Sequence, residues 1–235
     1  SKISGVFTIS SKGRINASLS NDLIFKSNKY IIVSFVNYKK QPEYIFGIGN
    51  DVKREDAEEI SQERFVFSST GLHRIKGKLY AGVNLTVASY FNIETEPESF
   101  LVVNNVTGVD GGTTLAIGPS VLRENRDNRY NPSKGSFLAI DYTFSTGTYN
   151  FDRFRFDARK YYEPFKAYRL VLAGQVTTTY SSGDVPFYEL SMLGGDSKMR
   201  GYYLGALRDK VSVDGQFEVR APVWNIFGVK IGRAS

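Results

Sequence analysis

Long segments in which apolar and polar residues alternate limit this chain's fold more than any other feature of its sequence. Three of them cover residues 78–91, 136–144 and 168–180. In the second segment, the apolar side chains at alternate positions are Leu138, Ile140, Tyr142 and Phe144. Because successive side chains of a β-strand point to opposite faces, this pattern predicts strands with one apolar and one polar face.

The whole sequence predicts an all-β, antiparallel fold with no internal domain boundary. Turn signals such as Ser145-Thr146-Gly147 separate the expected strands. The strands are expected at residues 3–10, 14–26, 28–38, 59–70, 73–91, 112–124, 135–147, 150–163, 166–181, 209–223 and 226–235.

These expected strands are long for a globular protein. Many have about 12 to 15 residues, whereas ordinary strands have about five or six. A tilted strand needs about 9–11 residues to cross a bilayer. Tyrosines near the expected strand ends, such as Tyr161, Tyr162, Tyr168, Tyr180, Tyr202 and Tyr203, are typical of side chains at a membrane interface. Alternation alone fits a soluble β-sandwich equally well, so both architectures stay open at this point.

Composition excludes several classes of function. The 235 residues include no Cys, which excludes disulfides, thiolate chemistry and Cys-ligated metal centres. The net charge is +6, but Lys and Arg are interleaved with acidic residues and form no basic block, so we expect no nucleic-acid partner. The sequence also has no apolar run of the roughly 18 residues that a transmembrane helix requires.

The common catalytic motifs are missing from the sequence. It contains no G-x-S-x-G nucleophile motif, no phosphate-binding P-loop and no H-E-x-x-H zinc motif. The single histidine, His73, is expected beside a turn between two strands. We therefore expect a protein that is not an enzyme and that has no catalytic residues, cofactor or metal site.

One expected strand carries an unusual row of arginines. In residues 151–159, the side chains of Arg153, Arg155 and Arg159 share one face, and the opposite face is apolar. Arginines that face lipid destabilise a membrane strand. This basic ladder is therefore expected to face a wet lumen or partner carboxylates. A solvated strand face in a soluble protein is the alternative interpretation.

Two further segments carry recognisable motifs. The first, residues 126–135, reads RDNRYNPSKG, in which Asp127 is followed by a turn with Pro132 and Gly135. The second, residues 186–204, reads PFYELSMLGGDSKMRGYYL. It contains the motif residues Gly194, Gly195, Arg200, Gly201 and Tyr202. Two expected strands separate the first motif's strand from the second motif.

Together with the segment YIFGIGN at residues 44–50, these motifs resemble the BamA/TamA superfamily of outer-membrane assembly and transport barrels, also called bacterial surface antigens. The resemblance covers residues 44–223. It implies a transmembrane antiparallel β-barrel of about 16 strands when complete, of which roughly 11 are present here. Residues 1–235 would be one barrel domain that lacks strands at its C-terminus, with room for further missing strands at its N-terminus.

The resemblance also implies roles for particular residues. Residues 186–208 would form an extracellular loop that folds into the barrel lumen. Its Arg200 would pair with an acid on the following strand, where Glu218 is the favoured candidate and Asp214 the second. This expectation agrees with the physical requirement that a charged guanidinium in a lumen finds acceptors.

Three functions remain open. The resemblance implies a bacterial outer-membrane protein that inserts or transports proteins, with the lipid bilayer as its surroundings. An open sheet edge would allow pairing with other outer-membrane proteins or assembly machinery. The alternatives are a passive pore that the basic ladder biases toward anions, and a membrane anchor without transport activity of its own.

Overall fold

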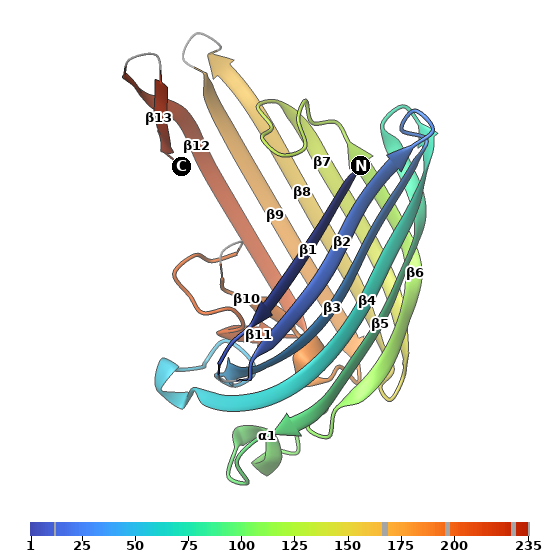
Figure 1. Ribbon diagram of the computed structural model, residues 1–235, viewed down its shortest axis with the longest axis vertical. Helices are drawn as coiled ribbons and strands as arrows, with labels where there is room; N and C mark the ends of the chain where they lie inside the picture. The colour runs from blue at the N-terminus through green and yellow to red at the C-terminus, as the bar shows by residue number, and fades with distance from the viewer. Residues whose placement is uncertain (12, 166–168, 196–197, 227–228, 235) are drawn as a thin grey trace.

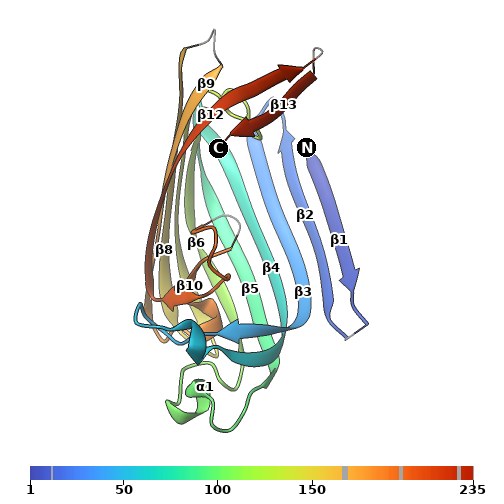
Figure 2. The same ribbon diagram turned by 90° about the vertical axis from the view of Figure 1, so that its left-hand side faces the viewer.

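The chain forms one large curved sheet. The computed structural model describes residues 1–235 except 12, 166–168, 196–197, 227–228 and 235, and it describes the backbone alone at residues 54, 222–226 and 229–234. Within these residues, eleven strands form an antiparallel sheet in the order β1-β2-β3-β4-β5-β6-β7-β8-β9-β12-β13. The sheet curves into an incomplete barrel with β1 and β13 as its end strands (Figure 1, Figure 2). We call the space on its concave side the lumen.

Each strand pairs with its neighbour in sequence, except where β10 and β11 form a separate small hairpin. The strands are β1 (Lys2–Ile9), β2 (Ile15–Phe25), β3 (Tyr30–Ile45), β4 (Glu58–Lys76), β5 (Leu79–Glu94), β6 (Gly112–Glu124), β7 (Gly135–Gly147), β8 (Phe151–Phe165), β9 (Leu170–Gly183), β10 (Ser191–Leu193), β11 (Leu207–Asp209), β12 (Val211–Ile226) and β13 (Val229–Ala234). The helical segments are η1 (Arg54–Asp56), α1 (Phe100–Val103) and η3 (Phe187–Glu189). Among the described residues, no helix combines the length and the apolar composition needed to cross a bilayer.

The predicted fold class is confirmed, and most strands lie within a few residues of their expected positions. The exception is the region from β3 to β5, where the prediction of a turn near residues 71–74 was wrong. β4 continues through Gly71 to Lys76, so His73 lies inside a strand, with its ring centroid 5.0 Å from that of Tyr30. A Cβ on Gly82 would stand 1.8 Å from the carbonyl oxygen of Gly71. The missing side chain of Gly82 therefore allows β5 to approach β4 closely at this point, a second common use of glycine in strands.

Strand register separates an inner polar face from an outer apolar face, as the alternation predicts. Asp141 of β7 pairs with Arg155 of β8, which pairs with Thr179 of β9, and all three face the lumen. The alternate residues point outward, and outward-facing Phe217 on β12 is 71% exposed. Sequence alternation and sheet curvature thus agree on which side is wet.

The interface tyrosines are only partly as predicted. Tyr162 and Tyr180 are exposed, whereas Tyr161 is buried on the inner face. Tyr202 and Tyr203 belong to the long segment between β11 and β10, not to a strand end. Tyr168 lies outside the described residues.

The two ends of the barrel differ. The turn end carries short connections such as residues 26–29 and 77–78, together with the longer β6–β7 connection. The long-loop end carries residues 46–57, 95–111 and 184–210, which lie together in Figure 1.

Apolar packing covers the inside of the long-loop end. Its buried members are Ile45, Ile60, Ala88, Tyr90, Leu101, Phe151, Val185, Phe187, Tyr188 and Leu190, which we call the apolar cluster. α1 is fixed beside it because the carboxylate of Glu58 accepts hydrogen bonds from the Ser99 hydroxyl and the Phe100 backbone N–H. Burial of such side chains stabilises a fold by roughly 1.5–3 kcal/mol each, so this end is a firmly packed part of the molecule.

Candidate functional site

Three groups of residues come together in the lumen and form the candidate site. The first is the lumen loop, residues 184–210, which contains the predicted range 186–208. The second is the β6–β7 turn, residues 125–134. The third is the basic ladder of Arg153, Arg155 and Arg159 on β8. The lumen loop lies on the concave side of the sheet in both ribbon views (Figure 1, Figure 2).

The start of the lumen loop is fixed by aromatic packing. Tyr188 stacks on Tyr90 of β5 with 3.9 Å between ring centroids, and Phe187 is fully buried. The Phe187 backbone N–H donates to the carbonyl of Thr107 in the neighbouring long loop. Burial, together with nearby Tyr149, raises the pKa of Tyr188 above its ordinary value, so this ring stays neutral. The loop therefore begins as part of the apolar cluster.

The next part of the lumen loop contains a short hairpin that contacts β12. β10 and β11 pair with each other, and the Ser191 hydroxyl is hydrogen-bonded to that of Ser212 on β12. Gly194 has φ +110°, and a Cβ there would stand 2.0 Å from the carbonyl oxygen of Tyr203. Only a residue without a side chain fits this position, so the first glycine of the predicted pair has a direct steric role in closing the loop.

Arg208 is a functional candidate that the sequence did not reveal. It is 2% exposed and lies on β11 in the lumen loop. Its backbone carbonyl accepts a hydrogen bond from the backbone N–H of Gly49, and this β-bridge joins the lumen loop to residues 46–57. Its guanidinium donates to the Gly205 carbonyl at 3.4 Å. A buried arginine in a short irregular segment has no periodic signature that a sequence could show.

The tip of the lumen loop contacts β12 through Arg200. Its Nη2 lies 3.3 Å from Oε1 of Glu218, the favoured partner among the two predicted acids. Glu218 also holds Arg220, with Nη2 to Oε2 at 2.7 Å. Asp214 does not contact Arg200 and instead accepts a 2.7 Å hydrogen bond from the Thr177 hydroxyl of β9. The structure thus brings one predicted pair together, while Asp214 joins two strands.

Each arginine of the basic ladder has a carboxylate close by. Arg153 Nη1 lies 2.8 Å from Oε2 of Glu189 in the lumen loop, and its Nη2 donates to the Glu189 carbonyl. The partner of Arg155 is Asp141 at 3.9 Å, and that of Arg159 is Asp157 at 2.5 Å. The ladder faces the lumen, but its positive charge is largely offset.

The β6–β7 turn folds around Asp127. Its carboxylate accepts hydrogen bonds from the backbone N–H groups of Asn128, Ser133 and Lys134 and from the Ser133 hydroxyl. Desolvation raises the pKa of this carboxyl, but these hydrogen bonds outweigh it and hold the pKa at about 2. Gly135 closes the turn with φ +104°, where a Cβ would stand 2.1 Å from the Asn125 carbonyl.

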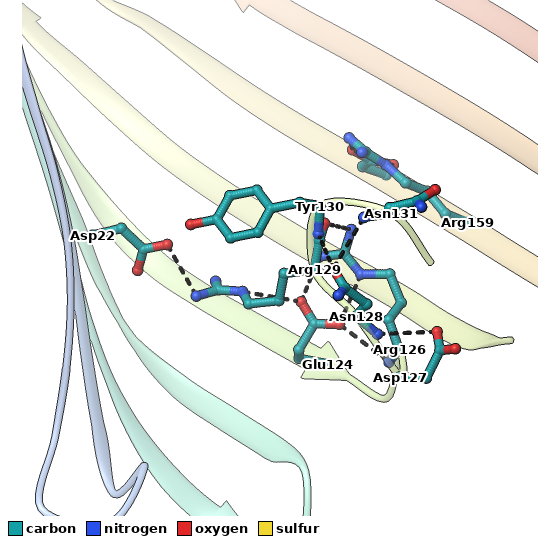
Figure 3. Close-up of polar contacts among 10 residues, drawn as sticks. Asp22, Glu124, Arg126, Asp127, Asn128, Arg129, Tyr130, Asn131 and Arg159 are labelled. Carbon is teal, nitrogen blue, oxygen red and sulfur yellow. Dashed lines mark hydrogen bonds and ion pairs between the residues drawn. The ribbon is translucent and has the colours of Figure 1, made fainter. Parts of the chain in front are cut away.

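The turn also reaches across the lumen to β2, as Figure 3 shows. Glu124 at the end of β6 binds Arg126 at 2.5 Å and lies 3.6 Å from Arg129. Arg129 Nη1 in turn lies 2.9 Å from Oδ2 of Asp22. The sequence indicated Asp127, Pro132 and Gly135 as the turn motif but gave no sign of Arg129 or Asp22, because their pairing joins residues 107 positions apart.

Comparisons with known proteins agree with the barrel fold. The Omp85 superfamily domain matches residues 9–234. The fold is similar to the crystal structure of BamA from Haemophilus ducreyi lacking POTRA domains 1–3, with a TM-score of 0.59 and 16% sequence identity. The match covers 91% of this chain and 46% of that one, so the chain spans about half the length of the solved structure. Sequence comparison with characterised proteins gives no significant match.

Proposed function

Because this chain belongs to the Omp85 superfamily, we propose that it acts in the insertion or transport of proteins at the bacterial outer membrane. The family and the barrel fold imply an outer-membrane setting with the lipid bilayer around the apolar outer face. In the proposed role, incoming strands add to an edge of the sheet through main-chain hydrogen bonds. This needs no catalytic group, cofactor or metal, so we propose that the protein is not an enzyme.

The observation that carries this proposal is the attachment of the lumen loop at its start and at its tip. Arg153 and Tyr90 hold its start through Glu189 and Tyr188. Glu218 holds its tip through Arg200. A loop attached in this way links β12, which lies next to the edge strand β13, to β5 and β8 across the lumen. A strand near an edge that accepts other strands has to keep its register, and we assign this support to the loop.

The passive pore is the weaker alternative. Its anion preference would rest on Arg153, Arg155 and Arg159, yet each of them lies near a carboxylate. The apolar cluster also packs the lumen loop against the inner face of the sheet at the long-loop end. The first feature weakens the positive electrostatic potential that would attract anions, and the second narrows the passage through which they would move.

The decisive experiment uses the full-length protein in liposomes. We expect it to accelerate the folding of an added unfolded outer-membrane barrel, measured by the gel mobility shift of the folded form. Arg200→Ala should lower this acceleration, whereas Lys198→Ala, in the same loop, should leave it unchanged. Absence of any acceleration, combined with a steady anion-selective current that loop substitutions do not alter, would establish the pore instead.

A further inference from the structure

The two sequence motifs, far apart in the chain, are held by adjacent inward residues of β12. Glu218 binds Arg200 at the tip of the lumen loop. Arg220, one inward position further along, binds Glu218 and donates from Nη1 to the carbonyl of Pro132 at 3.5 Å. The lumen loop comes from the long-loop end and the β6–β7 turn from the turn end, so they meet at this part of β12.

The other side of the β6–β7 turn contacts the opposite flank of the sheet. Arg129 binds Asp22 on β2, and Lys2 Nζ of β1 lies 5.5 Å from the ring centroid of Tyr130. Seven strands, β3 to β9, separate β2 from β12 in the sheet order. The turn therefore projects from the middle of the sheet and contacts strands near both of its ends.

We propose that the β6–β7 turn is a cross-brace that fixes the separation of the β1–β2 hairpin from β12 across the lumen, with Arg129 and Arg220 as its two attachments. This inference concerns the conformation of the barrel and goes beyond the proposed assembly role. Any movement that widens the distance between β2 and β12 has to break one of these two attachments.

A brace has to be stiff, and the turn meets this requirement. Asp127 gathers four hydrogen bonds inside the turn, and Pro132 fixes its own φ. The Glu124–Arg126 pair, with side chains only 13% and 9% exposed, ties the turn to the end of β6. The turn therefore transmits a displacement at one attachment to the other without changing its own shape.

The two attachments differ in strength. Arg129 and Asp22 form a charge-assisted bond at 2.9 Å with side chains 30% and 28% exposed. Oδ1 of Asp22 is buried and has no hydrogen-bond partner within the described residues, so its carboxylate depends on Arg129. The Arg220 contact is longer, at 3.5 Å, and its acceptor is a neutral carbonyl. When the barrel widens, the Arg220 attachment should break first, and the turn should move with β2.

Distance measurements between spin labels test the brace in the full-length protein in bilayers. The chain has no Cys, so Leu23→Cys on β2 and Val219→Cys on β12 provide label positions on the outer face. With the brace intact we expect one narrow distance distribution. Arg129→Gln and Asp22→Asn should each shift and broaden this distribution. The double variant should shift and broaden it by no more than either single variant, because both substitutions break the same attachment. Arg123→Gln, an exposed arginine one residue before Glu124, is the matched control.

A second label pair separates the two attachments. One label on the turn, at Lys134→Cys, is combined with a second label on β2, at Leu23→Cys, or on β12, at Val219→Cys. In the Arg220→Gln variant, the distribution of distances from the turn to β2 should stay narrow, while the distribution from the turn to β12 should broaden. Gel mobility of the folded form verifies that each variant forms a barrel. If the β2–β12 distribution stays narrow in Arg129→Gln and Asp22→Asn, or if the two effects add independently, the brace is overturned.

Discussion

Arg153 of β8 binds Glu189 of the lumen loop twice, through the carboxylate at 2.8 Å and through the backbone carbonyl. The two side chains are only 18% and 14% exposed. A charged pair of this kind is strongly coupled, since loss of one partner leaves the other charge unpaired in a poorly solvated place.

Arg153→Ala should therefore release the start of the lumen loop. We expect the free energy of unfolding to fall by roughly 2–4 kcal/mol, because the Glu189 carboxylate is left without its cation. Trypsin, which cleaves after Lys198 and Arg200, should cut the loop faster in this variant. Arg159→Ala is the control, because the partner of Arg159 is Asp157 on the same strand. Equal cleavage of the two variants would contradict the attachment.

Arg200→Ala should separate function from assembly. Its side chain is 63% exposed, and an exposed ion pair contributes about 0–1 kcal/mol, so the barrel should still assemble with little loss of stability. The loop tip, however, loses its contact with β12, and substrate folding should slow. Normal insertion or transport by this variant would show that the tip contact has no role.

Glu218→Gln should have a larger effect than Arg200→Ala. Glu218 holds both Arg200 and Arg220, so its neutralisation weakens the loop tip and leaves the Arg220 guanidinium with a poorer acceptor. We expect a larger decrease in substrate folding and in the urea midpoint of unfolding. Asp214→Asn should not reproduce the loss of the loop contact, because Asp214 bonds Thr177. Proteolysis of the loop distinguishes the two variants.

Gly194→Ala should open the lumen loop for a steric reason. The new Cβ meets the Tyr203 carbonyl at 2.0 Å while φ is +110°, and backbone strain alone costs about 1–3 kcal/mol. Gly201 has a similar φ of +97°, but a Cβ there would have open space around it. Gly201→Ala therefore shows the effect of backbone strain without a steric clash. Protease sensitivity should rise more for Gly194→Ala, and the reverse order would refute the close contact.

The β6–β7 turn should lose its internal hydrogen bonds in acid. The pKa of Asp127 is about 2 in the folded turn, below the value near 3.9 of an unfolded Asp. A lowered pKa stabilises the fold at pH values above the unfolded pKa, and this contribution is lost as the pH falls from about 4 towards 2. The protection factors of the Ser133 and Lys134 amides, which are hydrogen-exchange rates corrected for the intrinsic pH dependence of exchange, should fall over this range. In Asp127→Asn the protection factors of the same amides should change little with pH.

The strands were predictable because their signal is local. Alternation along β7, β8 and β9 depends on neighbouring residues alone, and it located both the strands and their wet face. The prediction of the β4–β5 boundary failed because Gly71 lies inside β4, and a glycine within a strand looks the same in sequence as a glycine in a turn. Gly82 of β5 is likewise inside a strand, where it permits a close backbone approach.

The site was predictable only where a motif marked it. The pairing of Arg200 with Glu218 followed from the resemblance to a family, and alternation added that Glu218 faces inward. Arg129, Asp22 and Arg208 carried no such mark. Their contacts depend on how far the sheet curves and on where a turn folds back, and both are set by the whole barrel rather than by nearby sequence.

The apolar cluster makes release of the start of the lumen loop a cooperative step. Phe187, Tyr188 and Leu190 of the loop pack together with side chains of β3, β4, β5 and β8. Lifting this part of the loop off the sheet would expose several large side chains to water, at roughly 1.5–3 kcal/mol each. We therefore expect this part of the loop to detach in a single step, when one group of side chains unpacks.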